Sequence, residues 1–253
     1  MLAGSLFSTF VVAWLALAAV IFAVLWFVTA PYGRYSRRGW GATVPAALAW
    51  LLMEAPSPLI FAVFFVAGPR HTGAVVWVFL LMWEAHYVHR AFVYPWMVRD
   101  AGRRMPAGIM CMALLFNTVN AGINGRWLFA LSAGYATSWL ADPRFVVGAV
   151  LFVAGFVLNR WSDTVLRSLR DAHGTGYSIP QGGLYRWVSS PNYLGEIVEW
   201  SGWALATCSL PGLAFAVWTA ANLVPRARAN RRWYRATFSD YPKERRALVP
   251  GVW

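Results

Sequence analysis

The sequence predicts an all-α integral membrane protein with seven transmembrane helices, and three observations support this prediction. First, 59% of the residues are hydrophobic and only 13% are charged, which is more apolar surface than one soluble core requires. Second, the apolar stretches approach the length of about 17 to 25 residues that crosses a bilayer as a helix. Third, the basic residues gather in alternate loops, which is typical of a membrane bundle.

Seven apolar stretches follow one another along the chain. The first four cover residues 1–33, 41–69, 71–98 and 105–125, and the fifth begins at Phe145. Two more lie between Val188 and Arg226, separated by the turn sequence SLPG at residues 209–212. No repeat and no linker interrupts the series, so we expect a single domain over residues 1–253.

Residues 127–141 are apolar but number only 15, so they form either a short eighth span or a helix on the membrane surface. The distribution of basic residues over the loops decides between an eighth span and a surface helix. With seven spans, 17 Arg and Lys residues lie in the loops and tail on one side, and only three, Arg70, Arg126 and Arg144, lie on the other. Because basic loops stay in the cytoplasm, we expect seven spans, an outer N-terminus and a cytoplasmic C-terminus.

Several function classes are disfavoured. The net charge of +12 resides in segments that border a membrane, so we expect membrane lipids and no nucleic acid as partners. The sequence has no GxGxxG after a strand and no GxxxxGK, so a nucleotide would bind among helices. His86 and His89 suggest a metal, but four histidines in all are too few for a histidine-box oxygenase, and we expect no metal site.

Glu54 stands alone in a long apolar stretch, beside Pro56 and Pro58. Prolines break the hydrogen-bond ladder of a membrane helix and can leave a cavity near the carboxyl group. Desolvation there would hold the carboxyl group protonated and able to donate a hydrogen bond. The alternative is a residue near a helix end that reaches water.

Tyr87, Arg90 and Tyr94 share one helical face at i, i+3 and i+7. Arg90 is placed to bind an anion, and Tyr87 to present a phenol to a pocket. The alternative is a tyrosine and an arginine at the membrane surface, where such residues are common.

Two polar stripes follow in the second half. Asn159, Asp163, Arg167 and Arg170 span about 80° of a helix, and such a stripe could grip an adenosine diphosphate. Its alternative is a ladder of internal ion pairs. Asn192, Glu196 and Glu199 share a face of a later helix and mark a functional site, because carboxylates are costly at bilayer depth.

The basic tail over residues 226–246 is the other candidate side of a phosphate site, or a segment that lies on anionic lipid. Residues 181–193 form a loop rich in Gly, Ser and Pro, which could close over a nucleotide as a lid.

Five blocks together resemble the membrane steroid 5-alpha-reductases across nearly the whole chain. They are the helix around Glu54, HYVHRAFVYP at residues 86–95, NRWSDTVLRSLR at 159–170, IPQGGLYRWVSSPNYLGEIVEWSGWALAT at 179–207 and YRATFSDYPKERRALVP at 234–250. The resemblance implies an enzyme that takes NADPH from the cytoplasm and a flat lipophilic 3-oxo-Δ4 steroid from the bilayer, and reduces the C4–C5 double bond of the steroid.

The resemblance also implies roles for individual residues. Glu54 and Tyr87 would bond the substrate ketone, with Trp50 and Met53 beside them, in a substrate pocket built mainly from residues 1–125. The NADPH pocket would come mainly from residues 155–250 and be lined by Arg90, Arg104, Asn159, Asp163, Arg167, Arg170, Asn192, Tyr193, Glu196, Arg226, Asn230, Tyr234 and Arg245. Met53 and Asn230 stand where mammalian members have glutamine and histidine, which bears on substrate range and cofactor affinity.

Other functions remain open at this stage. The same apparatus would reduce another conjugated lipid, such as a trans-2-enoyl thioester or a polyprenal. A membrane methyltransferase of the isoprenylcysteine carboxyl type and a transporter are further alternatives, although the chain shows none of the duplicated halves that a transporter predicts.

We expect a monomer. The use of 21 Arg and one Lys favours a bacterial inner membrane over endoplasmic reticulum.

Overall fold

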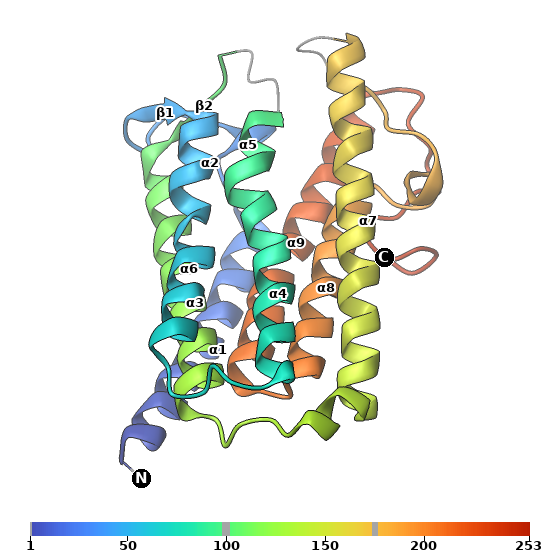
Figure 1. Ribbon diagram of the computed structural model, residues 1–253. Helices are drawn as coiled ribbons and strands as arrows, with labels where there is room; N and C mark the ends of the chain where they lie inside the picture. The colour runs from blue at the N-terminus through green and yellow to red at the C-terminus, as the bar shows by residue number, and fades with distance from the viewer. Residues whose placement is uncertain (1, 98–101, 174–176) are drawn as a thin grey trace. The chain divides into compact units, whose positions relative to one another are not determined.

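The computed structural model describes residues 2–97, 102–173 and 177–253, and these residues are mostly helical (Figure 1). The α-helices are α1 (Leu2–Phe27), α2 (Ala46–Glu54), α3 (Pro56–Ala67), α4 (Ala74–Val88), α5 (Tyr94–Met97), α6 (Ala107–Arg126), α7 (Pro143–His173), α8 (Pro191–Thr207) and α9 (Leu210–Thr237). Short helical turns are η1 (Gly33–Tyr35), η2 (His89–Val93), η3 (Trp127–Leu131), η4 (Thr137–Ala141) and η5 (Gly183–Arg186). Two strands, β1 (Thr43–Pro45) and β2 (Arg104–Pro106), pair antiparallel.

Several of these elements join end to end. The helix α3 follows α2 after one residue, the π-helical turn η2 links α4 to α5, and the π-helical turn η3 extends α6. The described residues therefore form seven helical segments, which confirms the all-α prediction. Four segments are long and apolar enough to cross a membrane: Gly4–Phe27, Ala46–Ala67, Ala107–Leu131 and Pro143–Leu169.

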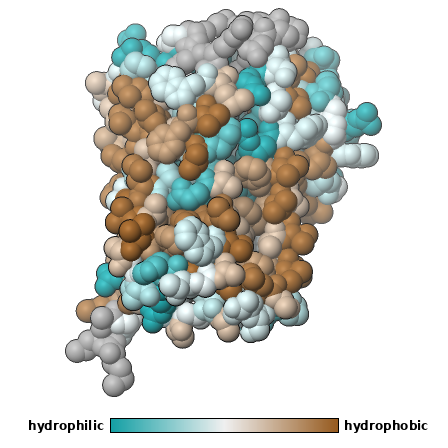
Figure 2. Space-filling view, in the orientation of Figure 1, coloured by the Kyte–Doolittle hydropathy of each residue, from teal (hydrophilic) through white to brown (hydrophobic). Residues whose placement is uncertain are grey.

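These helices carry apolar side chains on their outer faces. On α3, Leu59, Val63 and Val66 are exposed and follow i, i+4 and i+7, so they form one stripe. The space-filling view shows broad apolar areas of this kind (Figure 2). Contiguous exposed apolar surface is costly in water, so these faces are suited to lipid.

The chain forms two compact units. Unit 1 comprises Met1–Val11 and Ala30–Phe145, and unit 2 comprises Val12–Thr29 and Val146–Trp253. In unit 1 the strands pair with Val44 opposite Met105, and each strand runs directly into a helix, β1 into α2 and β2 into α6. The ribbon therefore starts α2 and α6 side by side, and α6 packs along both α2 and α3.

Aromatic rings fill the core of unit 1. Phe61 of α3 stacks on Trp83 of α4 with 4.4 Å between ring centroids, and its edge meets Phe129 at 5.0 Å. All three side chains are buried. This cluster fixes α4 against α3, which positions the polar residues one to two turns away.

Unit 2 is built on a close contact between α7 and α8. The contact uses two glycines on each helix, seven residues apart: Gly148 and Gly155 on α7, and Gly195 and Gly202 on α8. A Cβ at Gly195 would lie 2.5 Å from the backbone nitrogen of Asn159. Only glycine permits so close a backbone approach, so these positions set the register of the two helices.

Two predicted element boundaries were wrong. Residues 127–141 form neither an eighth span nor one surface helix, because η3 continues α6 and only the short 3₁₀ turn η4 follows. The final helix does not end near Arg226. It runs from Leu210 to Thr237 through Pro225, so much of the predicted basic tail is helical.

Candidate active site

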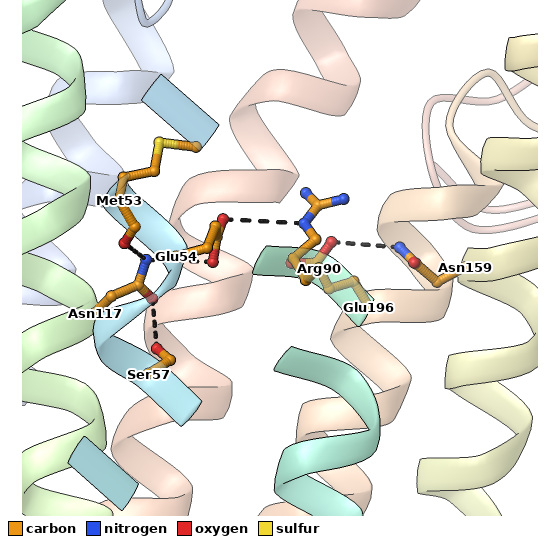
Figure 3. A network of polar contacts seen from close by, with 7 residues as sticks. All are labelled: Met53, Glu54, Ser57, Arg90, Asn117, Asn159 and Glu196. Carbon is orange, nitrogen blue, oxygen red and sulfur yellow. Dashed lines mark hydrogen bonds and ion pairs between the residues drawn. The ribbon is translucent and has the colours of Figure 1, made fainter. Parts of the chain in front are cut away.

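Glu54 ends α2 at a proline-interrupted turn of the candidate span. Pro56 and Pro58 have no N–H, so the carbonyls of Leu52 and Glu54 lose their usual helical donors. The Glu54 side chain is 12% exposed, and its Oε1 lies 3.9 Å from Nε of Arg90. Its Oε2 accepts a hydrogen bond from Nδ2 of Asn117 over 3.3 Å (Figure 3). The carboxyl group therefore lies between a cation and an amide donor.

Arg90 contacts two aromatic rings. Its guanidinium carbon lies 4.7 Å from the ring centroid of Trp50 and 4.9 Å from that of Tyr94. Arg90 lies in the π-helical turn η2, a departure from α-helix that is common at functional sites. The two rings meet edge to face, with centroids 6.0 Å apart, so they contact the guanidinium from adjacent sides and restrain the charge beside Glu54.

Tyr87 is buried on α4. Its ring packs on Trp83 with 4.9 Å between centroids, and the Trp83 indole N–H donates to the carbonyl of Ser57 over 3.2 Å. Ser57 lies three residues after Glu54. Packing and hydrogen bonds thus connect Tyr87 to the turn that carries Glu54, within one unit.

The other two predicted residues of this region have different surroundings. Met53 is buried in an apolar cluster with Ala49, Met105 and Ile109. Arg104 of β2 donates to the hydroxyl of Thr43 over 2.7 Å and to its carbonyl over 2.6 Å, so its guanidinium holds the strand ribbon together.

In unit 2 the predicted polar stripes of α7 and α8 meet. Asn159 donates to Oε2 of Glu196 over 3.3 Å (Figure 3). It also donates to the carbonyl of Asn192 over 3.0 Å. One turn further along, the Asn192 amide donates to Oδ1 of Asp163 over 3.2 Å. The two stripes form one hydrogen-bonded seam. Glu199 extends the face and is fully buried beside Gly155.

The helix α9 brings further predicted residues to α8. Arg226 donates through Nε to the hydroxyl of Tyr193 over 3.2 Å. Asn230 donates to Oγ of Ser190 over 3.2 Å, and Ser190 is the residue that precedes α8. Tyr234 is buried and stacks on Tyr241, with ring centroids 5.2 Å apart.

Arg245 ties the C-terminal segment to the loop before α8. Its guanidinium donates to the carbonyl of Pro180 over 2.9 Å and to Oε1 of Gln181 over 2.7 Å. It also lies 5.3 Å from the ring of Tyr241. Burial raises the pKa of the Tyr241 phenol, and the hydroxyl of Ser189 and the charge of Arg245 oppose that rise.

The loop predicted over residues 181–193 ends at Ser190, directly before α8 begins, and it is anchored at Tyr185 and Val188. Val188 and Arg246 form an isolated parallel bridge, and the buried phenol of Tyr185 donates to the carbonyl of Ser162 over 3.1 Å. A lid that moved as one piece would have to break these contacts.

Two buried donors of unit 2 are available to a ligand. Arg245 is 2% exposed, yet its Nε finds no hydrogen-bond partner among the described residues, and neither does the buried hydroxyl of Ser162. Buried donors without partners are rare and point to an acceptor such as a phosphate or amide oxygen. Arg167 is half-buried on the same stripe of α7. The side chain of Arg170 lies outside the described part of the structure.

Asn117 and Ser57 were not predicted from the sequence. Both are buried and both contact the turn at Glu54. A polar residue inside an apolar span was the available signal, but α6 also contains Asn120 and Asn124. Sequence alone could not tell which asparagine faces Glu54.

Comparison with known proteins agrees with these observations. The family described as 3-oxo-5-alpha-steroid 4-dehydrogenase matches residues 103–253. The chain is 41% identical to a steroid 5-alpha-reductase DET2 of Solanum lycopersicum, over 97% of this chain and 96% of that protein. It is also 41% identical to 3-oxo-5-alpha-steroid 4-dehydrogenase 1 of Bos taurus, over 93% and 92% of the two chains, and 40% identical to that of Homo sapiens, over 87% and 85%.

A match of this extent assigns the chain to a class of oxidoreductases. The chain belongs to the steroid 5-alpha-reductase family, and the resemblance seen in its sequence is confirmed.

Proposed function

We propose that the protein reduces the C4–C5 double bond of 3-oxo-Δ4 steroids of the testosterone and progesterone type with NADPH. The observation that carries this proposal is the partly buried carboxyl group of Glu54, which belongs to an apolar candidate span and lies between Arg90 and Asn117. The names of the relatives supply the substrate class.

The reaction requires donors at the substrate ketone. When a hydride adds to the β-carbon of an enone, negative charge builds on the carbonyl oxygen, and donors aimed at that oxygen in a dry site stabilise the transition state. Protonated Glu54 and the phenol of Tyr87 are these donors. One proton at the α-carbon completes the reduction. Trp50 and Met53 belong to the same substrate pocket.

Unit 2 is proposed to hold NADPH, which supplies the hydride when bound. Arginine guanidiniums bind phosphate through paired N–H groups, and amide and carboxylate groups suit the sugar and nicotinamide. The proposed cofactor residues are Asn159, Asp163, Arg167, Arg170, Asn192, Tyr193, Glu196, Arg226, Asn230, Tyr234 and Arg245, together with Arg90 and Arg104 of unit 1.

The proposed topology has seven spans, with the N-terminus outside and the C-terminus in the cytoplasm. The asymmetry of 17 basic residues against three supports it. Beyond the four candidate spans, α4 with α5, α8 and α9 would complete the bundle, and the burial of His86, Glu199 and Asn230 on these helices supports this assignment. A bacterial inner membrane, a monomeric state and a single functional domain belong to the same proposal.

The deciding experiment measures NADPH oxidation by the purified protein in detergent, with progesterone or testosterone as substrate. The product should gain the mass of two hydrogen atoms, with one NADPH oxidised per product. Glu54→Gln and Tyr87→Phe should each lower kcat by about 10²-fold or more while NADPH affinity is retained. NADPH binding without steroid reduction would indicate another lipid enone, and an absence of NADPH binding would overturn the proposal.

A further inference from the structure

Asn117 of α6 contacts the turn that carries Glu54 at three points. Its Nδ2 donates to the carbonyl of Met53 over 2.6 Å and to Oε2 of Glu54 over 3.3 Å. Its Oδ1 accepts the hydroxyl hydrogen of Ser57 over 3.1 Å. The side chain is only 5% exposed, and Figure 3 shows it between these three residues.

The proline-interrupted turn takes a hydrogen bond from a neighbouring helix. Pro56 and Pro58 leave the carbonyls of Leu52 and Glu54 without helical donors, and in a membrane such a turn relies on polar groups of neighbouring helices. Asn117 donates to the carbonyl of Met53, which lies between these two carbonyls. The same nitrogen reaches the carboxyl group, so one residue contacts both the backbone of the turn and the Glu54 side chain.

The orientation of the amide is determined by its neighbours. The carbonyl of Met53 can only accept, so the NH₂ group of Asn117 must face it. Ser57 donates to the opposite side of the amide, and Ser57 is itself held because its carbonyl accepts from the indole of Trp83. A flipped amide would place two acceptor oxygens against each other at Met53.

From this geometry we propose that Asn117 is a positioning residue for Glu54. The N–H donor of Asn117 holds Oε2, and Oε1 lies on the Arg90 side, 3.9 Å from Nε. The carboxyl group is thereby kept in one orientation, in which it is proposed to meet the substrate ketone. This inference rests on the proposed function, because it assumes that Glu54 donates to the ketone.

A double-mutant cycle tests the proposal. Asn117→Leu keeps the approximate shape but removes the donor, and it should lower kcat for steroid reduction by about 10- to 100-fold with KM and NADPH affinity changed by less than about twofold. In the Glu54→Gln background the same substitution should lower kcat by less than about twofold. Residues that act through one another are non-additive, whereas damage to packing lowers kcat equally in both backgrounds.

Asn124→Leu is the matched control. Asn124 is buried on the same helix, and its amide donates to the backbone and side chain of Asn120. The Asn124→Leu variant should keep kcat within about twofold of the unmodified protein. An equal loss in Asn124→Leu would show that the helix and not the Glu54 contact is responsible, and would overturn the proposal.

Ser57→Ala provides a second route if Asn117→Leu does not fold. Without the hydroxyl the amide loses the donor at Oδ1, so kcat should fall by about threefold in the presence of Glu54 and not in Glu54→Gln. Equal losses in both backgrounds would contradict the inference. Full activity of Glu54→Gln itself would instead refute the proposed role of Glu54, and so distinguishes the two failures.

Discussion

Gly155 of α7 lies so close to α8 that a Cβ at this position would fall 2.3 Å from the backbone nitrogen of Glu199. The contact is reciprocal, because a Cβ at Gly195 of α8 would meet the backbone of Asn159. Asn159 can reach Asn192 and Glu196 only while the two backbones are this close. The glycines therefore assemble the polar seam of unit 2.

The first prediction concerns this helix contact. Gly155→Ala should force α7 and α8 apart, destabilise the protein by about 1–3 kcal/mol and weaken NADPH binding by about tenfold. Thermal unfolding in detergent and NADPH titration measure the two effects.

Gly122→Ala is the control for this variant. Gly122 is also helical, but a Cβ there would have no neighbour within 4 Å. Since alanine favours a helix over glycine by about 1 kcal/mol, stability should be unchanged or raised. Equal behaviour of the two variants would mean that the helix contact is not under steric control.

The second prediction concerns Arg245. Arg245→Lys keeps the charge but cannot form the two guanidinium bonds to Pro180 and Gln181 together. Loss of a buried charged hydrogen bond costs about 1.5–3 kcal/mol, so NADPH affinity should fall by about tenfold or more. Limited proteolysis should also cut the loop before α8 faster.

Arg235→Lys serves as the comparison, because Arg235 is exposed on α9. It should bind NADPH and resist protease like the unmodified protein. If Arg245→Lys also binds NADPH and resists protease like the unmodified protein, Arg245 is not part of the cofactor site.

The third prediction is a pH dependence at Tyr241. Burial raises the pKa of this phenol, so the folded protein favours the neutral form more than the unfolded chain does. The contribution of Tyr241 to the free energy of unfolding is fully present below the unfolded pKa of about 10. It is lost as the pH rises through the folded pKa.

Tyr241→Phe tests this by removing the hydrogen bond to Ser189, which is 2.7 Å long. It should cost about 1 kcal/mol of stability at pH 7 to 9, and the difference from the unmodified protein should shrink above about pH 10. A difference that stays constant up to pH 11 would contradict the expected titration.

The fourth prediction concerns Met53, where mammalian relatives are expected to have glutamine. Met53 packs among Ala49, Met105 and Ile109, so Met53→Gln would bury an amide in apolar surroundings at a cost of about 1–3 kcal/mol. Thermal unfolding should show the loss. Because Met53 is also proposed to border the substrate, the steroid preference should change as well, and unchanged stability would contradict the expected cost of burying the amide.

The sequence predicted the helices well because hydropathy and turn signals are local properties. Apolar stretches and the SLPG turn located the segments that became α1 to α9, and the i, i+4 pattern placed Asn192 and Glu196 on one face. Boundaries were less predictable. Whether residues 127–141 continue α6, and where α9 ends, depends on packing that no local window contains.

The sequence by itself determined that this chain builds membrane-type helices and which of its polar residues stand out against an apolar background. Only the tertiary structure decided which partners those residues have. Asn117 and Glu54 are 63 positions apart, and they meet because the strand ribbon starts α2 and α6 side by side. Such contacts depend on backbone separation and register between helices, which composition and periodicity within a single helix do not encode.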